Sequence, residues 1–281
     1  MSGLPSTATQ ASDLRWQLAC ELAQLCPPDL GREIVLTGST SMGIADEYSD
    51  IELVFYVDMP PLAEQRADWL YEIGVEDLVL DTDPIADGSL WATFRFHDVW
   101  VEAGWQSLAD HEKNLAAILS GEVLDHHALT LGWIMQQALP VCSEGYLAGW
   151  QQSLATYPEA LTPRLLANAT ELWNFPHLVA ASRALIQRGE RFTLTERLLR
   201  EVHNVLRILF ALNQQWEPVW KWLAYTTANL ALKPADLVER INAIFSSSQP
   251  EQSLLLCRNL VHDTLLLVPP VYDVSCALAL I

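Results

Sequence analysis

The sequence predicts an α+β N-terminal domain, with a small mixed sheet and flanking helices, followed by an all-helical domain. Short segments rich in β-branched and aromatic residues end near residue 107, and apolar residues beyond that point recur at helical spacing. The chain has 281 residues, of which 51% are hydrophobic, so it can bury a large core and is long enough for two domains. We expect residues 1–110 to form the first domain and residues 111–281 to form the second.

The first hundred residues mix helix and strand patterns. Leucines at three- and four-residue spacing predict a helix from about residue 12 to 25, which the CPPDLG segment ends. Strands are predicted at 33–37 and 51–57, and the helix that follows them ends at Gly74. The segments LWATFRF and VWVEAG flank a turn at His97 and Asp98, which predicts two paired strands.

Beyond residue 107 the strand pattern gives way to successive amphipathic helices. The segment SLADHEKNLAAILSG begins with a serine cap and ends at a glycine, and TLTERLLREVHNVLRILFALNQQ is the clearest predicted helix. In this helix Thr193 and Glu196 have the spacing of a capping box. Pro218 and Pro234 lie where further helices could start, and SSSQP predicts a loop before a last helix.

The charge of the chain excludes several classes of partner. It has 16 Lys and Arg residues against 35 Asp and Glu residues, which gives a formal net charge of −19. Nucleic acids and anionic lipid surfaces are bound through many cationic contacts, so we expect neither nucleic acid nor membrane as a partner. A cationic small molecule would be attracted instead. The number of subunits is not predictable from these features.

Cysteine usage and the chain ends indicate a cytoplasmic protein. The five cysteines are odd in number and contain no CxxC pair, which argues against a disulfide framework and a zinc site. The first residues lack the basic and apolar regions of a signal peptide. The apolar stretch near the other end is interrupted by Pro269, Pro270 and Asp273, so it makes a poor membrane span.

The segment LTGSTSMGIADEYSDIELVFYVD carries the clearest chemical pattern. A strand leads into Gly38 and Ser39, and Ser49 and Asp50 open the next strand, with Glu52 two residues further on. Because side chains alternate along a strand, Asp50 and Glu52 project from one face and the apolar residues project from the other. Paired carboxylates can hold Mg²⁺ against substrate phosphates, and a small Gly-Ser turn lets backbone N–H groups approach phosphate oxygens.

This segment resembles the active-site signature of the nucleotidyltransferase superfamily that includes DNA polymerase β. In that signature a Gly-Ser turn is followed by two carboxylates separated by one residue. The resemblance implies that Gly38, Ser39 and Ser49 bind the nucleotide and that Asp50 and Glu52 hold two Mg²⁺ ions. The sequence departs from the signature at Glu52, where the superfamily usually has aspartate; glutamate is one methylene longer and can still bind a metal.

A third carboxylate is expected on a neighbouring strand. The VWVEAG segment offers Glu102, with Trp100 on the same face, and adjacent strands lie about 4.8 Å apart, so Glu102 could reach the metal pair or an acceptor hydroxyl. Asp98 is the alternative if the strand pairing is shifted. In the aminoglycoside-modifying branch of the superfamily the third carboxylate is a general base, and the resemblance implies this role, together with metal binding, for Glu102.

A nucleoside triphosphate also needs cations, and the first hundred residues contain only four, all of them arginines. In the second half, Arg200, His203 and Arg207 form a basic stripe, and Lys221 lies between two tryptophans at the expected start of a helix, where desolvation is costly without an anion. Aminoglycoside adenylyltransferases place an arginine and a lysine of their helical domain on the phosphates, which by resemblance implies Arg207 and Lys221. A solvated helix face with a snorkelling lysine is the alternative.

Other histidines and tryptophans have simpler interpretations. Adjacent residues of a helix point about 100° apart, so His126 and His127 are not expected to share a metal. Most of the eleven tryptophans are expected to pack in the core, although Trp100, Trp105 or Trp173 could stack on a nucleobase or a sugar ring.

The resemblance is greatest to the aminoglycoside and lincosamide nucleotidyltransferases, in which the substrate lies between an α/β and a helical domain. It implies transfer of a nucleoside monophosphate, AMP from ATP by default or another NTP, to a hydroxyl of a small molecule. An aminoglycoside-type antibiotic would suit the acidic chain. Two alternatives stay open: a protein adenylyltransferase of the antitoxin type, and a catalytically degenerate nucleotide-binding protein.

Overall fold

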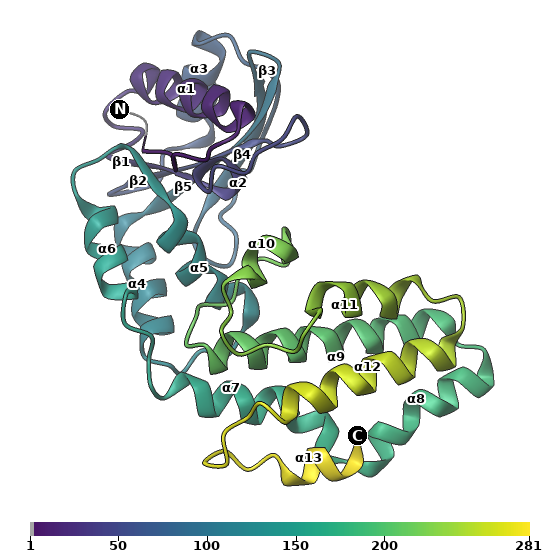
Figure 1. Cartoon of the computed structure of the whole chain (residues 1–281). Helices are drawn as coiled ribbons and strands as arrows, with labels where there is room; N and C mark the ends of the chain where they lie inside the picture. The colour runs from purple at the N-terminus through teal and green to yellow at the C-terminus, as the bar shows by residue number, and fades with distance from the viewer. Residues whose placement is uncertain (1–2) are drawn as a thin grey trace. The chain divides into compact units, whose positions relative to one another are not determined.

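The computed structural model describes residues 3–281, which form two compact units (Figure 1). An α/β unit followed by a helical unit is the fold class expected from the sequence, and it is confirmed. The first unit contains the chain up to Ser120 together with Leu131–Thr156, and the second contains Gly121–Thr130 together with Tyr157–Ile281.

The first unit is built on a six-stranded sheet with the strand order β3-β4-β5-β2-β1-β6. β2 and β5 pair in parallel, and the other neighbours are antiparallel. His97 and Asp98, both with positive φ, join β4 to β5 as a two-residue hairpin where the sequence predicted a turn. The strands are β1 (Glu33–Thr37), β2 (Ile51–Val57), β3 (Glu76–Leu80), β4 (Leu90–Phe96), β5 (Val99–Ser107) and β6 (Leu139–Cys142).

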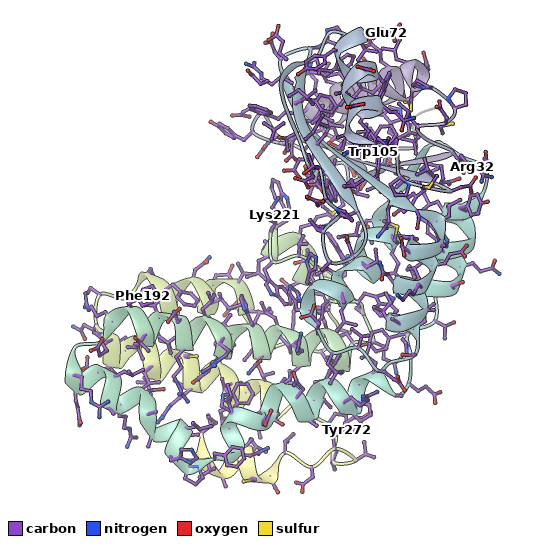
Figure 2. All side chains as sticks on the ribbon, turned by 180° about the vertical axis from the view of Figure 1, so that it is seen from behind. Arg32, Glu72, Trp105, Phe192, Lys221 and Tyr272 are labelled. Atoms are coloured by element: carbon purple, nitrogen blue, oxygen red, sulfur yellow. The ribbon has the colours of Figure 1, made fainter. Side chains whose placement is uncertain are left out.

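One face of the sheet carries the hydrophobic core of the first unit. Leu53 and Phe55 alternate along β2 on this face, and both are fully buried. Trp105 of β5, labelled in Figure 2, stacks on Phe55 with the ring centroids 5.0 Å apart. Helices α1 (Gln10–Leu25) and α3 (Ala63–Glu72) add their apolar side chains to the same cluster, so they cover this face.

Helices α4 (Leu108–Leu119) and α6 (Tyr146–Leu154) pack on the opposite face of the sheet. Tyr56 of β2 contacts His111 of α4 and Trp150 of α6, with ring centroids 4.5 Å and 4.7 Å apart. Burial lowers the pKa of His111 to about 3, so this histidine is neutral near pH 7. The domain boundary expected at residue 110 lies inside α4, which packs with the sheet.

A buried carboxylate holds the start of α6 against the sheet. Glu33, the first residue of β1, is fully buried and accepts hydrogen bonds from the backbone N–H groups of residues 144–147 at 2.7 to 3.4 Å. The hydroxyl of Ser143 donates a further bond at 2.7 Å. The first N–H groups of a helix have no partner inside the helix, and a negative charge at this end is favourable. Glu33 therefore joins α6 to β1.

The second unit is organised around its longest helix, α9 (Arg191–Leu212). Leu198, Val202, Val205 and Leu209 recur at helical spacing on the buried side of α9 and belong to the core of this unit. The other helices are α7 (Leu161–Thr170), α8 (Pro176–Arg188), α10 (Leu223–Ala228), α11 (Leu237–Ser246), α12 (Pro250–Leu265) and α13 (Ser275–Leu280), with a 3-10 helix at Glu171–Asn174. Helix α5 (His126–Gln137) contributes residues to both units.

Three expectations about individual elements are corrected. The strands β3 and β6 were not predicted, and β6 contains Pro140, a residue that a sheet tolerates only at its edge. Helix α9 begins at Arg191, so Thr193 lies inside its first turn and is not its cap. The helix after SSSQP is followed by one more, α13. Within residues 3–281, no helix combines the length and the apolar character needed to cross a membrane.

Replacing Glu33 with alanine is expected to lower the free energy of unfolding by about 3 kcal/mol, because several buried N–H groups lose their acceptor. Chemical denaturation followed by tryptophan fluorescence measures this change. Glu144→Ala is the matched control, since Glu144 is exposed and pairs with Arg32 at the surface, and its loss should stay below about 1 kcal/mol. Equal losses in the two variants would contradict the capping role of Glu33.

Candidate functional site

A row of four polar side chains crosses the sheet on the face opposite the hydrophobic core. The strand register aligns Thr37 of β1 with Glu52 of β2, Glu52 with Glu102 of β5, and Glu102 with Thr93 of β4. Directly paired residues project from the same face, and neighbouring strands lie about 4.8 Å apart. The two carboxylates are therefore neighbours on one face, with Glu52 half-buried and Glu102 exposed.

The Gly38 turn lies directly against this row. Gly38 follows β1 with a φ of +68° and opens the short helix α2 (Gly38–Ser41). A Cβ added to Gly38 would lie 2.4 Å from Oε1 of Glu52, and the Thr37 hydroxyl donates to Oε2 of the same carboxylate at 3.4 Å. Glycine is thus required twice, for the backbone conformation and for the space that the carboxylate occupies. The next residue, Ser39, is buried.

The loop before β2 carries Ser49 and Asp50. Asp50 is half-buried and directly precedes β2. The hydroxyl of Ser49 donates to Asp46 at 2.9 Å and closes a turn. Arg15 of α1 is buried and donates to the backbone oxygen of Ser49 at 2.7 Å, so it holds the loop from which Asp50 extends.

The register brings one of the two candidates for the third carboxylate beside Glu52. Asp98 lies in the turn between β4 and β5 and forms an ion pair with Arg95 at 3.0 Å. Glu102 is the carboxylate that pairs with Glu52. Trp100 lies two residues before Glu102, on the same side of β5, and its side chain is 51% exposed.

The two neighbouring carboxylates on this face are suitable ligands for Mg²⁺. Among residues 3–281, no three or more His, Cys, Asp or Glu side chains lie close enough to hold a metal ion together. Glu52 and Glu102 are brought side by side, whereas Asp50 as a further ligand stays a prediction. Mg²⁺ is usually held by one or two carboxylates, with substrate phosphates and water as its remaining ligands, so this pair fits the ion.

The two cations expected at the nucleotide belong to the second unit. Arg207 of α9 forms an ion pair with Glu217, with Nε 3.0 Å from Oε1. Glu217 is 2% exposed and also bonds Nδ1 of His126 at 2.8 Å, so the buried carboxylate has two partners. Lys221, labelled in Figure 2, is exposed and precedes α10, so the expectation of a desolvated lysine at the start of a helix is wrong.

Two of the tryptophans considered as stacking platforms cannot reach a ligand. Trp105 and Trp173 are at most 1% exposed, in the cores of the first and second unit respectively, and the expectation that either stacks on a nucleobase is wrong. His126, in contrast, stacks on Trp220 with the ring centroids 4.6 Å apart and the planes at 3°.

Sequence reasoning missed three residues that shape this site, namely Thr37, Thr93 and Arg15. Strand alternation marks both threonines as polar positions, but only the register between strands brings them into the row with Glu52 and Glu102. Arg15 lies on an amphipathic helix, and nothing in the spacing of α1 indicates that its guanidinium binds the loop carbonyl of residue 49.

Comparisons with known proteins find similar chains, but they do not establish the family to which this chain belongs. A family model described as a domain of unknown function, DUF4037, matches residues 136–223. No curated protein matches the chain. One similar solved structure is that of a nucleotidyltransferase-like protein from Exiguobacterium sibiricum 255-15, which has 13% sequence identity and a TM-score of 0.39. The match covers 92% of this chain and 76% of that one.

Replacing Gly38 with alanine is expected to lower the free energy of unfolding by about 3 kcal/mol, because the methyl group meets the Glu52 carboxylate and the backbone is left-handed. Gly74→Ala is the matched control: its φ is +77° and its Cβ would meet no atom within 4 Å, so only the conformational cost of about 1 kcal/mol applies. Chemical denaturation measures both.

The double variant Gly38→Ala/Glu52→Ala should recover part of the loss seen in Gly38→Ala, because the side chain that meets the methyl group is shortened. Residues in contact give non-additive effects of about 0.5–3 kcal/mol in such a cycle. Strictly additive losses would contradict the close contact between Gly38 and Glu52.

Proposed function

We propose that this protein is a Mg²⁺-dependent nucleotidyltransferase that transfers a nucleoside monophosphate, AMP from ATP in the first instance, to a hydroxyl group of a small molecule. The observation that carries the proposal is the side-by-side pairing of Glu52 with Glu102 beside the Gly38 turn. The resemblance implies a third carboxylate on a strand next to the one that carries the signature pair, and Glu102 lies at such a position.

Glu52 and Glu102, together with Asp50, are the residues proposed to hold two Mg²⁺ ions. When bound, the metal would neutralise phosphate charge and favour ionisation of the acceptor hydroxyl. Glu102 is the more exposed carboxylate, so it is the one that an acceptor can approach, and we assign it the role of proton acceptor. Gly38, Ser39 and Ser49 are proposed to contact the nucleotide.

The two candidate phosphate ligands of the second unit, Arg207 and Lys221, are not equally available to bind an anion. Arg207 already pairs with the buried Glu217, which reduces the positive charge it offers to an anion. Lys221 is exposed, and no carboxylate in the described part of the chain lies within ion-pair distance of it. We therefore propose Lys221 as the stronger candidate of the two.

The acceptor is proposed to be a hydroxylated small molecule, and aminoglycoside-type antibiotics are the first class to test. These compounds are polycations, and the chain has a net charge of −19, so long-range attraction favours their encounter.

A second candidate function, nucleotide binding without transfer, rests on Glu52, which stands where the signature usually has aspartate. The Glu52 carboxylate occupies the space directly over Gly38, where phosphate oxygens would approach the turn. Two anionic groups repel each other at this distance unless a cation lies between them. Nucleotide binding at this turn, with or without transfer, therefore requires Mg²⁺ beside Glu52.

We expect the purified protein to release pyrophosphate from MgATP in the presence of an acceptor from a panel of aminoglycosides and lincosamides. Glu102→Gln should lower kcat by about 10²–10⁴, because it removes the proposed proton acceptor. A coupled pyrophosphate assay measures the rate. Glu76→Gln is the matched control, since Glu76 is an exposed carboxylate on β3 of the same sheet, and it should leave kcat unchanged.

Full activity of Glu102→Gln would overturn the catalytic assignment. Calorimetry of ATP binding separates the two candidate functions. Mg²⁺-dependent binding without pyrophosphate release from any NTP would favour the non-catalytic candidate, and binding that is unchanged in Asp50→Ala would contradict both.

A further inference from the structure

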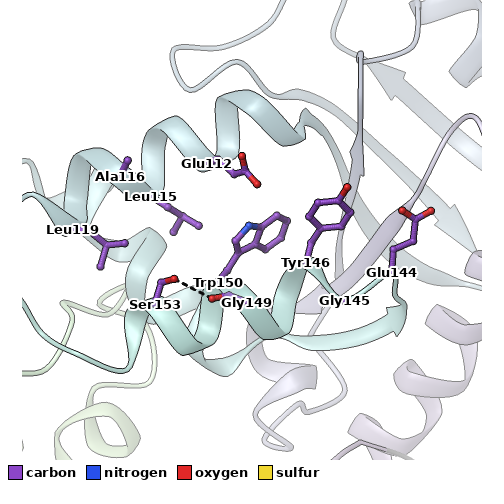
Figure 3. Close-up of a pocket in the computed structure, with 10 residues that line it drawn as sticks. All are labelled: Glu112, Leu115, Ala116, Leu119, Glu144, Gly145, Tyr146, Gly149, Trp150 and Ser153. Atoms are coloured by element: carbon purple, nitrogen blue, oxygen red, sulfur yellow. Dashed lines mark hydrogen bonds between the residues drawn. The ribbon is translucent and has the colours of Figure 1, made fainter.

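A cavity of about 570 Å³ between α4 and α6 is lined by groups that already have partners (Figure 3). Trp150 packs on His111 with the ring centroids 4.1 Å apart. The Tyr146 ring and the Glu144 carboxylate share Arg32 as their cation. Because these groups are engaged, this cavity does not indicate a class of ligand. The second unit contains a smaller cavity in which the charged groups are available.

This smaller cavity, of about 340 Å³, lies in the groove between α8 and α12. The two helices lie side by side in Figure 1, and Arg258 of α12 donates to the backbone oxygen of Val179 of α8 at 2.9 Å. The volume is in the range of small-molecule sites. The walls of the groove include Arg183 and Ile186 of α8 and Glu251, Leu254, Leu255 and Arg258 of α12.

Two arginines meet at one end of the groove without a carboxylate to pair them. Among residues 157–281, neither Arg183 nor Arg258 forms an ion pair with an acidic side chain. Burial lowers the pKa of Arg258, and the positive charge of Arg183 lowers it further, so the two guanidinium groups lie close enough to repel each other. Arg183 is exposed and Arg258 is half-buried, which leaves N–H donors accessible from the groove.

The carboxylate whose charge acts on Arg258 already has other partners. It belongs to Glu201, which pairs with Arg197 at 3.2 Å and accepts from the Cys257 thiol at 3.7 Å. Around Arg258, three guanidinium groups therefore share one carboxylate, although the whole chain has a net charge of −19. Repulsion between like charges is costly at short range, and a bound anion would relieve it.

The rest of the groove is apolar and ends at a carboxylate. Leu254 and Leu255 lie between Glu251 and Arg258 at helical spacing, and Ile186 adds to the apolar wall from α8. Leu255 is 53% exposed, so its side chain is open to a ligand. The helical rise separates Glu251 from Arg258 by about 10 Å along the axis of α12. Charge in the groove therefore favours a molecule with a single anionic end and an apolar body.

We propose that this groove binds a monocarboxylate with an unbranched apolar chain, of the medium-chain fatty acid class. The carboxylate accepts from Arg183 and Arg258, because guanidinium groups match the planar geometry of a carboxylate. The chain of the ligand lies along Leu255 and Ile186, and Glu251 disfavours a second negative charge at the far end. The site lies within the second unit and does not depend on the proposed transferase activity.

Calorimetric titration of the full-length protein with sodium octanoate tests this site. We expect one octanoate per chain with a Kd of about 1 mM or below. 1-Octanol has the same chain without the charge and should bind at least about tenfold more weakly, because it loses the charged hydrogen bonds. Sodium chloride at matched concentration controls for ionic strength. Equal binding of octanoate and 1-octanol, or no binding of octanoate, would overturn the proposal.

The carboxylate at the far end gives a second test. Octanedioate, which carries a second carboxylate, should bind at least about fivefold more weakly than octanoate, because its far end meets Glu251. Glu251→Gln should reduce this difference and leave octanoate binding in place. A preference for octanoate that is the same in the wild type and in Glu251→Gln would contradict the proposed orientation of the ligand.

Two further variants assign the binding to named groups. Arg183→Gln should weaken octanoate binding by about tenfold, whereas Arg188→Gln, an exposed arginine of α8 outside the cavity, should have no effect. Leu255→Asp should abolish binding by placing a negative charge beside the chain of the ligand. Octanoate binding that survives both Arg183→Gln and Leu255→Asp would reject this site.

The Arg183→Gln variant also guards against a trivial loss of structure. The substitution removes the repulsion between Arg183 and Arg258, so the melting temperature without ligand should stay equal or rise while binding weakens. Octanoate should raise the melting temperature of the wild type more than that of Arg183→Gln, since a ligand stabilises only the folded state that binds it. Equal shifts in the two proteins would contradict binding at Arg183.

Discussion

The parallel pairing of β2 with β5 is the constraint on which the chemistry of the first unit depends. In this register Leu53 and Phe55 lie beside Ala103 and Trp105 in the core, and Glu52 lies beside Glu102 on the opposite face. A shift by one residue would exchange the two faces of a strand. It would drive a carboxylate into an apolar layer, at a cost of several kcal/mol. The hydrophobic face therefore sets the position of the polar one.

The acidic residues of the chain divide into two groups by their surroundings. Those that are buried have partners: Glu33 accepts backbone N–H groups, Glu217 pairs with Arg207, and Glu201 pairs with Arg197 at 3.2 Å. Burial raises the pKa of Glu201, which the neighbouring Arg197 opposes. Carboxylates such as Glu102 and Glu112 are exposed. The buried carboxylates stabilise the fold, and the exposed carboxylates are available to bind cations.

Local patterns predicted much of the fold and fewer details of the site. The alternation in IELVFYV and the turn at His97 and Asp98 predicted β2, β4 and β5 closely, because both signals are local. The edge strand β6 was not predicted, because it is short and contains Pro140. The pairing of Glu52 with Glu102 joins residues fifty positions apart on two parallel strands. The sequence alone therefore left both Glu102 and Asp98 as candidates for the third carboxylate. The burial of Trp105 was within reach, since it alternates with Val101 and Ala103.

Net charge alone does not decide which cation an acidic protein binds; the groups beside each carboxylate do. Around Glu52 and Glu102 the neighbours are threonine hydroxyls and a glycine turn, which leave oxygen donors that can replace the water shell of a small, strongly hydrated ion. The excess of negative charge of the chain therefore does not by itself select an ion, whereas the oxygen donors beside Glu52 and Glu102 suit a small divalent one.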